Sequence, residues 1–325
     1  MRNKILFRAD ADQHIGYGHF IRTLALADML KDDFECVFCL QTPSEYQKAE
    51  LLKVCKYVEL PADDRKFDLF LDALAGNEIV VLDNYFFTCE YESQIRKKGC
   101  KVVLIDNLHK RHTCADAVLG FLMGLTEDAY YVEPYTKLYL GAGYTLLRRP
   151  FLYQLKKKHN PITDKGDLKV VISFGGADPQ RIAVSIANIL ESSDKVSKIT
   201  VIGNHSDGLM QSDKIIFRSG LSADEMCDAF VSNDLAILPA STTMLEALAC
   251  GIKIIGGYFV DNQLENYHQY VKADALIGCG DLSKKENQQK VREIIEGDEL
   301  EKRQLSNMII PGNLKENIIS VFKTL

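Results

Sequence analysis

The stretch Phe7-Arg-Ala-Asp-Ala-Asp-Gln-His-Ile-Gly-Tyr-Gly-His-Phe-Ile-Arg22 decides the fold of this 325-residue chain. The apolar run at residues 4–8 is typical of a β-strand, and residues 20–30 form a strong helix pattern. Gly16 and Gly18 lie between the two and mark a turn. A strand, a glycine turn and a helix in this order place free backbone amides at a helix N-terminus, where they can bind an anion.

His19 stands where this turn meets the helix. The positive end of the helix dipole disfavours an imidazolium, so we expect a neutral ring near pH 7 that can take a proton from water. Arg22 follows one helical turn later and lies beside the same turn. A structural interpretation stays open at this point, in which His19 caps the helix or fills the space between helix and sheet.

Length and composition indicate two globular domains. A chain of 325 residues can form two cores, and its apolar content of 46% and charged content of 26% are ordinary for a globular protein. The formal net charge of −6, with no basic stripe interleaved with aromatic residues, argues against a nucleic-acid partner.

Cysteine usage and hydropathy predict the compartment. The nine cysteines are scattered singly, without CxxC or metal-ligand spacing, so we expect reduced thiols in a cytoplasmic protein and no metal site. The chain enters a strand at once, and no apolar run approaches the ~18 residues of a membrane span. We therefore expect no signal peptide and no stable membrane association. A monomer or weak homodimer is sufficient for a site formed by two domains.

Residues 1–150 alternate short β runs with helical patterns, which indicates βαβ units around a parallel sheet. The predicted strands are residues 4–8, 35–40, 79–83 and 101–106, and the predicted helices are 20–30, 45–54, 66–74 and 91–98. Two buried strands end in Asp83 and Asp106. Ligands bind outside the carboxyl ends of strands in such sheets, so both carboxylates and Tyr85 are expected at the same crevice as His19. Either aspartate could instead cap the turn that follows it.

The pattern breaks at residues 151–166, a polar and charged segment that we interpret as a linker. Residues 167–325 then repeat the alternation and form the second predicted domain, with its last helices left open to return to the first. The predicted strands there are residues 168–173, 198–202, 214–217, 234–238 and 252–255, and the predicted helices are 181–191, 222–231, 241–250, a helix opened by 261–266, and the section after 284.

Two turns of the second half are candidate phosphate sites. Gly175 and Gly176 follow a predicted strand and allow close approach of a phosphate to the backbone. Ser241, Thr242 and Thr243 begin a helix directly after another strand, so their amides and hydroxyls can hold a diphosphate. Glu246 lies one turn further and can accept hydrogen bonds from a ribose. Taken singly, Ser241 could be an ordinary N-cap and Glu246 a solvated side chain.

The motifs together resemble a known family, the bacterial UDP-sugar hydrolases of pseudaminic acid biosynthesis. The motifs are Gly16-Tyr-Gly-His19-x-x-Arg22, Leu82-Asp-Asn-Tyr85, Gly175-Gly-Ala-Asp178, Ala240-Ser-Thr-Thr-Met-Leu-Glu246 and Asp261-Asn-Gln263. These hydrolases release UDP and a free sugar from UDP-2,4-diacetamido-2,4,6-trideoxy-β-L-altropyranose. They are related to the GT-B transferase that adds N-acetylglucosamine in peptidoglycan synthesis. The resemblance extends to about residue 280.

The resemblance implies an α/β fold of GT-B type, with two Rossmann-like parallel-sheet domains facing across a cleft. It implies that His19 is the general base for water attack at the anomeric carbon, with Tyr85 assisting in the sugar site. The remaining residues implied for substrate binding are Gly16, Gly18, Arg22 and Asp83 in the first domain and Gly175, Gly176, Ser241, Thr242, Glu246, Asn262 and Gln263 in the second. No cofactor is implied, and we expect a metal-independent reaction.

Two other functions are compatible with the same residues. A GT-B glycosyltransferase would use His19 to activate an acceptor hydroxyl in place of water, although no basic amphipathic segment for a membrane acceptor is seen. A non-catalytic nucleotide-sugar binding protein would keep the UDP site without turnover. The sequence does not identify the sugar attached to UDP.

Overall fold

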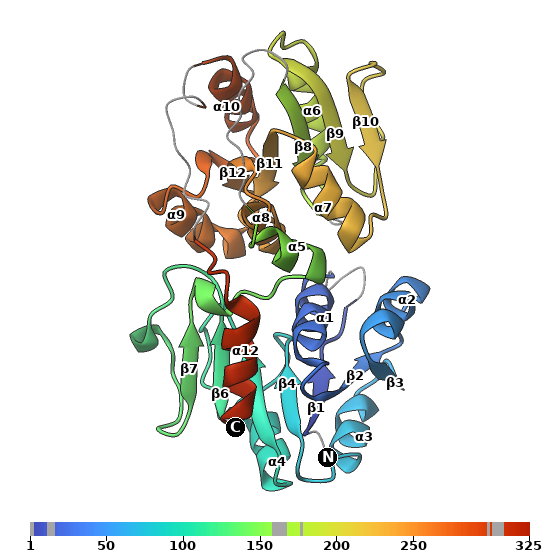
Figure 1. The fold of residues 1–325 in the computed structure, drawn as a ribbon, viewed down its shortest axis with the longest axis vertical. Coiled ribbons are helices and arrows are strands. Elements are labelled where there is room, and N and C mark those ends of the chain that lie inside the picture. The colour runs from blue at the N-terminus through green and yellow to red at the C-terminus, as the bar shows by residue number, and fades with distance from the viewer. Residues whose placement is uncertain (1–2, 12–16, 158–167, 176–177, 298–299, 301–308) are drawn as a thin grey trace. The chain divides into compact units, whose positions relative to one another are not determined.

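The computed structural model describes residues 3–11, 17–157, 168–175, 178–297, 300 and 309–325. The chain divides into two compact units (Figure 1). The N-terminal unit consists of Met1–Arg149 together with Asn313–Leu325, and the C-terminal unit is Pro150–Gly312. The predicted linker begins inside a helix, α5 (Arg149–Gln154), and its residues 158–166 lie outside the described part of the chain.

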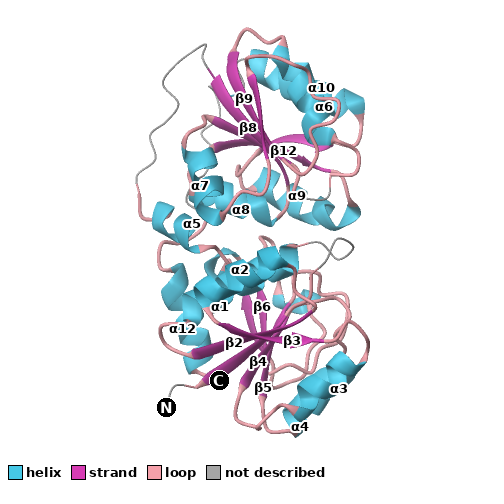
Figure 2. Ribbon diagram, turned by 90° about the vertical axis from the view of Figure 1, so that its right-hand side faces the viewer, coloured by secondary structure: helices cyan, strands magenta, loops and turns pink. Residues whose placement is uncertain are grey.

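The N-terminal unit is built on a seven-stranded parallel sheet with the order β3-β2-β1-β4-β5-β6-β7. The strands are β1 (Lys4–Arg8), β2 (Glu35–Gln41), β3 (Lys56–Leu60), β4 (Ile79–Leu82), β5 (Lys101–Ile105), β6 (Ala117–Gly120) and β7 (Lys137–Leu140). The central strands are apolar on both faces because helices cover both faces of the sheet. Figure 2 shows α1 (Gly18–Leu30), α2 (Glu45–Val54) and α12 (Leu314–Lys323) on one face, and α3 (Arg65–Asp72) and α4 (Cys89–Lys97) on the other.

The C-terminal unit has a six-stranded parallel sheet with the order β10-β9-β8-β11-β12-β13. Its strands are β8 (Leu168–Ser173), β9 (Val196–Ile202), β10 (Ile215–Arg218), β11 (Leu235–Pro239), β12 (Lys253–Tyr258) and β13 (Ile277–Asp281). Its helices after α5 are α6 (Ile182–Glu191), α7 (Ala223–Val231), α8 (Thr242–Ala249), α9 (Leu264–Lys272) and α10 (Lys285–Glu296). The predicted α/β class with two parallel-sheet units is therefore confirmed.

Both sheets reverse their strand order at one point. In the N-terminal unit the reversal lies between β1 and β4, and in the C-terminal unit it lies between β8 and β11. At such a point the connections leave the sheet toward opposite faces and open a crevice at the carboxyl ends of the two strands. His19 in the first turn of α1 follows β1, and Asp83, Gly175 and Ser241 lie in the loops after the other three strands.

The cysteine prediction is wrong for one pair. Cys89 and Cys114 form a disulfide in the N-terminal unit, across a sequence separation of 25. Such a separation follows no short spacing motif, so the sequence gives no sign of the contact. Seven other cysteines are free thiols, as predicted. Among the residues that the structure describes, no helix has the length and apolar character needed to cross a membrane.

Helix α12 completes the N-terminal unit from the far end of the chain. Its buried face consists of Leu314, Ile318, Val321 and Phe322. The Phe322 ring packs against Phe34, with ring centroids 6.2 Å apart, and Lys315 forms an ion pair with Asp32 at 2.9 Å. The section after residue 284 was predicted to be helical, and the structure shows which sheet its last helix covers.

We expect Phe322→Ala to destabilise the N-terminal unit by about 3–5 kcal/mol, because it opens a cavity under a side chain that is 1% exposed. The measurement is the urea dependence of hydrogen exchange in β1 and β4, which reports this unit separately. Lys323→Ala is the matched control, since its exposed ion pair with Asp33 is worth less than about 1 kcal/mol. Equal effects of the two substitutions would contradict the packing role.

Candidate active site

His19 lies in the first turn of α1, at the carboxyl end of β1. The helix begins at Gly18, and the side chain of its N-cap, Tyr17, makes no capping hydrogen bond. A Cβ added at Gly18 would meet no atom of the described residues within 4 Å. Gly16 lies outside the described residues. The predicted anion site at this helix N-terminus stays a prediction.

Asp83 holds the imidazole of His19. Nδ1 of His19 lies 2.7 Å from Oδ1 of Asp83, which follows β4 across the crevice. Nη2 of Arg22 is also 2.9 Å from Nδ1. Arginine can only donate hydrogen bonds, so the acceptor in this group is Oδ1 of Asp83, which accepts from both Nδ1 of His19 and Nη2 of Arg22. We assign the proton to Nδ1 from this network, which leaves the lone pair on Nε2.

The Asp83 carboxylate is saturated by protein donors. Its Oδ2 accepts from Nε of Arg22 at 2.6 Å and from Oγ1 of Thr23 at 2.8 Å, and its Oδ1 accepts from His19 and from Nη2 of Arg22. Burial alone would raise the pKa of Asp83, but the charges of Arg22 and His19 and their hydrogen bonds lower it to about 2. The side chain is 0% exposed. These contacts fix the His19 ring relative to Asp83, and the expected role of Asp83 in substrate binding stays a prediction.

His19 is influenced by two charged side chains as well as by the helix dipole. The structure adds a carboxylate and a guanidinium beside the ring, and these act on an imidazolium with opposite signs. The sequence argument from the dipole alone was therefore incomplete. Arg22 is held in place both by Asp83 and by the ring of Phe121, whose centroid lies 5.7 Å from the guanidinium carbon.

Tyr85 lies on the solvent side of the His19 ring. Its ring meets the His19 ring edge-on, with centroids 4.6 Å apart, and the residue is 62% exposed. The prediction that Tyr85 reaches the same crevice is consistent with this contact. Asp106 behaves as a turn residue, because its Oδ1 accepts from the backbone amides of Leu108 at 2.8 Å and His109 at 3.3 Å.

Several supporting residues escaped the sequence analysis. Asn84 bridges to the backbone of Asp10, accepting from its amide at 2.7 Å and donating to its carbonyl at 3.1 Å. These two bonds tie the end of β4 to the end of β1, and so fix the spacing between Asp83 and His19. Arg8 and Asp10 form a fully buried ion pair below them. The available signals were Arg8, a charged residue inside an apolar strand, and the polar residues Asp10 and Asn84 just after two strands.

In the C-terminal unit, the two predicted phosphate turns lie on either side of the strand-order reversal. Gly175 follows β8 with φ +77, a conformation that favours glycine, and a Cβ there would meet no atom of the described residues within 4 Å. Ser241 is the N-cap of α8, yet its side chain makes no capping hydrogen bond. Ser241 and Thr242 are half-buried. Gly176 lies outside the described residues.

The other predicted binding residues of this unit differ in their surroundings. Glu246 on α8 is buried, at 8% exposed, so the alternative of a solvated side chain is excluded. Asn262 is exposed on the short 3-10 helix η3 (Asp261–Gln263). Gln263 uses its Oε1 to accept from the amide of Phe259 at 3.1 Å, which shapes the loop after β12 and leaves its side-chain NH₂ as a donor.

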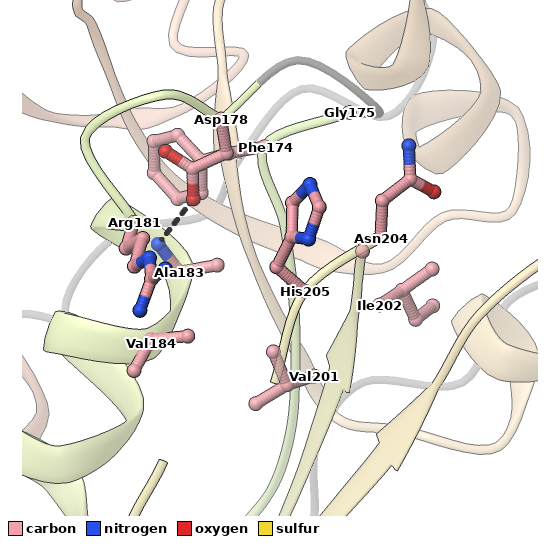
Figure 3. Close-up of a pocket in the computed structure, with 11 residues that line it drawn as sticks. Phe174, Gly175, Asp178, Arg181, Ala183, Val184, Val201, Ile202, Asn204 and His205 are labelled. Carbon is pink, nitrogen blue, oxygen red and sulfur yellow. Dashed lines mark hydrogen bonds between the residues drawn. The ribbon is translucent and has the colours of Figure 1, made fainter. Parts of the chain in front are cut away.

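A small pocket lies at the carboxyl ends of β8 and β9, next to the start of α6 (Figure 3). Its polar lining comes from Asp178, Arg181, Asn204 and His205. Asp178 accepts from the amides of Ile182 and Ala183, both at 2.9 Å, and so caps α6. The sequence analysis did not predict this pocket, because Asn204 and His205 follow β9 without a motif.

Comparison with known sequences finds relatives across most of the chain, and no family model matches it. The uncharacterized protein MJ1062 of Methanocaldococcus jannaschii is 26% identical over 284 residues, covering 83% of this chain but only 58% of the relative. The UDP-2,4-diacetamido-2,4,6-trideoxy-β-L-altropyranose hydrolase of Campylobacter jejuni is 23% identical over 280 residues, covering 80% and 93%. The spore coat polysaccharide biosynthesis protein SpsG of Bacillus subtilis is 23% identical over 295 residues, covering 84% and 82%.

Solved structures share the fold at low identity. The Staphylococcus aureus MnaA–UDP complex superposes with a TM-score of 0.69 at 11% identity, covering 99% of this chain and 96% of that one. Acinetobacter baumannii MurG gives 0.61 at 11% identity, with both chains fully covered. These structures confirm the predicted GT-B-type α/β fold. The resemblance to the altropyranose hydrolase, drawn from the motifs, is confirmed as similarity over most of the chain.

Proposed function

We propose that the protein is a UDP-sugar hydrolase that releases UDP and a free diacetamido-trideoxy sugar for surface polysaccharide synthesis. The observation that carries this proposal is the buried Asp83 carboxylate 2.7 Å from Nδ1 of His19, at the strand-order reversal of the N-terminal sheet. The similarity to the Campylobacter jejuni hydrolase supports the substrate class.

In this mechanism His19 is the general base. Its Nε2 takes a proton from water as the water oxygen bonds to the anomeric carbon, and the bond from that carbon to the phosphate oxygen breaks. UDP leaves with the electron pair. Asp83 stabilises the imidazolium formed at that moment, because its carboxylate stays ionised and accepts the hydrogen bond from Nδ1–H throughout. A base held in this way typically contributes ~10²–10⁴-fold to the rate.

The C-terminal unit is proposed to bind the nucleotide. Negative charge grows on the leaving phosphate, and the amides at the start of α8, with the hydroxyls of Ser241 and Thr242, are suited to stabilise it. Gly175 leaves room for a phosphate on the other side of the reversal. Glu246, Asn262 and Gln263 are assigned to the ribose, diphosphate and sugar by the family resemblance.

Glycosyl transfer is the second candidate function, since MurG and other sugar-nucleotide proteins share the fold. It would use the same groups, with an acceptor hydroxyl in place of water. Incubation of the purified chain with a UDP-diacetamido sugar and no acceptor distinguishes the two. A hydrolase releases UDP and free sugar over many turnovers, whereas a strict transferase releases little of either.

We expect His19→Asn to lower the turnover of the UDP-sugar by roughly 10²–10⁴-fold, because it removes the proton acceptor. UDP affinity, measured by calorimetry, should stay within about twofold, as the nucleotide groups lie in the C-terminal unit. His268→Gln, an exposed histidine on α9, is the control and should leave turnover unchanged. Full activity of His19→Asn would exclude the mechanism and leave only UDP binding.

Asp83→Asn should also reduce turnover by roughly 10²–10⁴-fold, since a carboxamide does not fix the Nδ1–H tautomer. Its acid stability should change too. The pKa of Asp83 falls from 3.8 to about 2 on folding, so ionised Asp83 stabilises the native state above pH 4. That contribution, about 2 kcal/mol, is lost as the pH falls from about 4 to 2, and Asp83→Asn should not show this component.

Asp116→Asn is the control for Asp83. Asp116 is a buried carboxylate of the same unit, paired with Arg96 and Lys101 at the start of β6, and its pKa is also lowered. Its substitution should lower stability near neutral pH and remove the component that wild type loses in acid, but leave turnover intact. If both variants turn over substrate at the wild-type rate, Asp83 does not position a general base.

Ser241→Ala should weaken UDP binding about tenfold or more, because a hydrogen bond to a charged group contributes about 1.5–3 kcal/mol. Ser222→Ala is closely matched: Ser222 is also an N-cap of the C-terminal unit, but its hydroxyl already accepts from the amide of Glu225. That control should lose about 1 kcal/mol of stability and keep its UDP affinity. Equal UDP affinities of the two variants would place the diphosphate elsewhere.

A further inference from the structure

A second cluster of reactive side chains lies in the N-terminal unit, apart from His19 and Asp83. Cys89 is the first residue of α4, while His112 and Cys114 lie in the segment that joins β5 to β6. Each residue offers one ligand atom, which is a sulfur for the cysteines and a ring nitrogen for the histidine. These three atoms lie within 4.8 Å of one another. Thiolate and imidazole are the ligands that Zn²⁺ prefers.

A buried carboxylate fixes the His112–Cys114 segment against α4. Glu92 is 0% exposed, and its Oε2 accepts from Oγ1 of Thr113 at 2.6 Å and from the amide of Cys114 at 2.7 Å. Its Oε1 accepts from Nη2 of Arg111 at 2.7 Å. These three bonds do not depend on the Cys89–Cys114 bond. The backbone that carries two of the three side chains is therefore held in position when the disulfide is reduced.

His112 has the surroundings of a metal-binding histidine. Its Nε2 lies 3.2 Å from Oε1 of Glu133, and its ring packs on Tyr131 with centroids 4.3 Å apart. In zinc sites, the second ring nitrogen of a ligand histidine is commonly bonded to a carboxylate, which orients the ring and raises its basicity. Glu133 supplies such a carboxylate.

Cys89 lies at the start of a helix. It occupies the first position of α4, whose N-cap Thr88 accepts from the amide of Tyr91. The thiolate is the form of cysteine that binds a metal. Cys89 and His112 are half-buried, so an ion can approach from solvent.

We propose that the reduced chain binds one thiophilic divalent cation, of the Zn²⁺ class, through Cys89, Cys114 and His112. Binding replaces two thiol protons by the ion: two thiols, one neutral imidazole and Zn²⁺ give the three-ligand complex and two released protons. Three protein ligands leave a fourth position for water. The disulfide and the metal complex exclude each other, because both use the same two sulfurs.

This site is distinct from the groups proposed for UDP-sugar hydrolysis, and it would join the start of α4 to the β5–β6 segment in place of the disulfide. The proposal does not depend on the proposed function. Its test therefore measures metal binding to the full chain and needs no substrate.

The experiment starts by reducing the full-length protein with a phosphine, which takes oxygen from water and leaves two thiols for each disulfide. Zn²⁺ binding is then measured by competition with a chromogenic chelator, and Co²⁺ binding by its thiolate charge-transfer absorption. We expect one equivalent of either ion in the reduced chain and none after oxidation by a small-molecule disulfide. Cys89→Ser and Cys114→Ser should lose this equivalent, and His112→Gln should weaken it.

Glu133→Gln tests the carboxylate that orients His112, and the partly exposed side chain can be replaced without disturbing the core. We expect this substitution to lower Zn²⁺ affinity roughly 10–100-fold. Cys55→Ser, a half-buried cysteine outside the cluster, is the control and should retain one equivalent. Circular dichroism checks that each variant is folded. The proposal is wrong if the reduced wild type binds no Zn²⁺, or if folded Cys89→Ser and His112→Gln bind it as tightly as the wild type.

Discussion

The buried carboxylate of Asp83 is the constraint on which the N-terminal unit depends. A charge with no exposed surface is unfavourable unless it is fully paired, and Asp83 is paired by His19, Arg22 and Thr23, all from the first two turns of α1. One residue after β4 thereby determines how α1 sits on the sheet. The same bonds select the tautomer of His19. One set of contacts therefore both stabilises the position of α1 and selects the tautomer of His19.

This arrangement explains why the strand-order reversal matters. Parallel strands on either side of a reversal send their loops to opposite faces of the sheet, so residues of the two loops meet only above the strand ends. In the N-terminal unit, the Asn84 side chain holds those loops together by two hydrogen bonds to the backbone of Asp10. The C-terminal unit has the same strand-order reversal, with Gly175 and Ser241 after its two strands.

Much of the fold could be predicted from local sequence, because its signals are short-range. The helix at Glu45–Val54 and the strand at Leu168–Ser173 match their predicted residues, and most others are within a few positions. Strands β3, β6, β7 and β13 were missed. Strand β3 follows α2 after one residue and contains the charged residues Lys56 and Glu59, and β13 contains two glycines, so neither has the apolar run that marks a buried strand.

The candidate site was predictable in its residues but not in their roles. A glycine turn before a helix identifies His19 from sequence, whereas the pairing of Asp83 with His19 spans 64 positions and is visible only in three dimensions. The Cys89–Cys114 contact was hidden for the same reason. Side-chain spacing in sequence reports contacts within a helix or turn, and both of these pairs join different elements.

The position of α12 has a consequence for the order in which the chain becomes folded. The C-terminal unit lies between two parts of the N-terminal unit in sequence, so the chain crosses between the units twice. A domain emerging first from the ribosome ordinarily folds first. Here the sheet formed early in synthesis leaves a strip of its surface uncovered until Leu314–Lys323 is made, after the whole second unit has been translated. The unit that starts first is completed last.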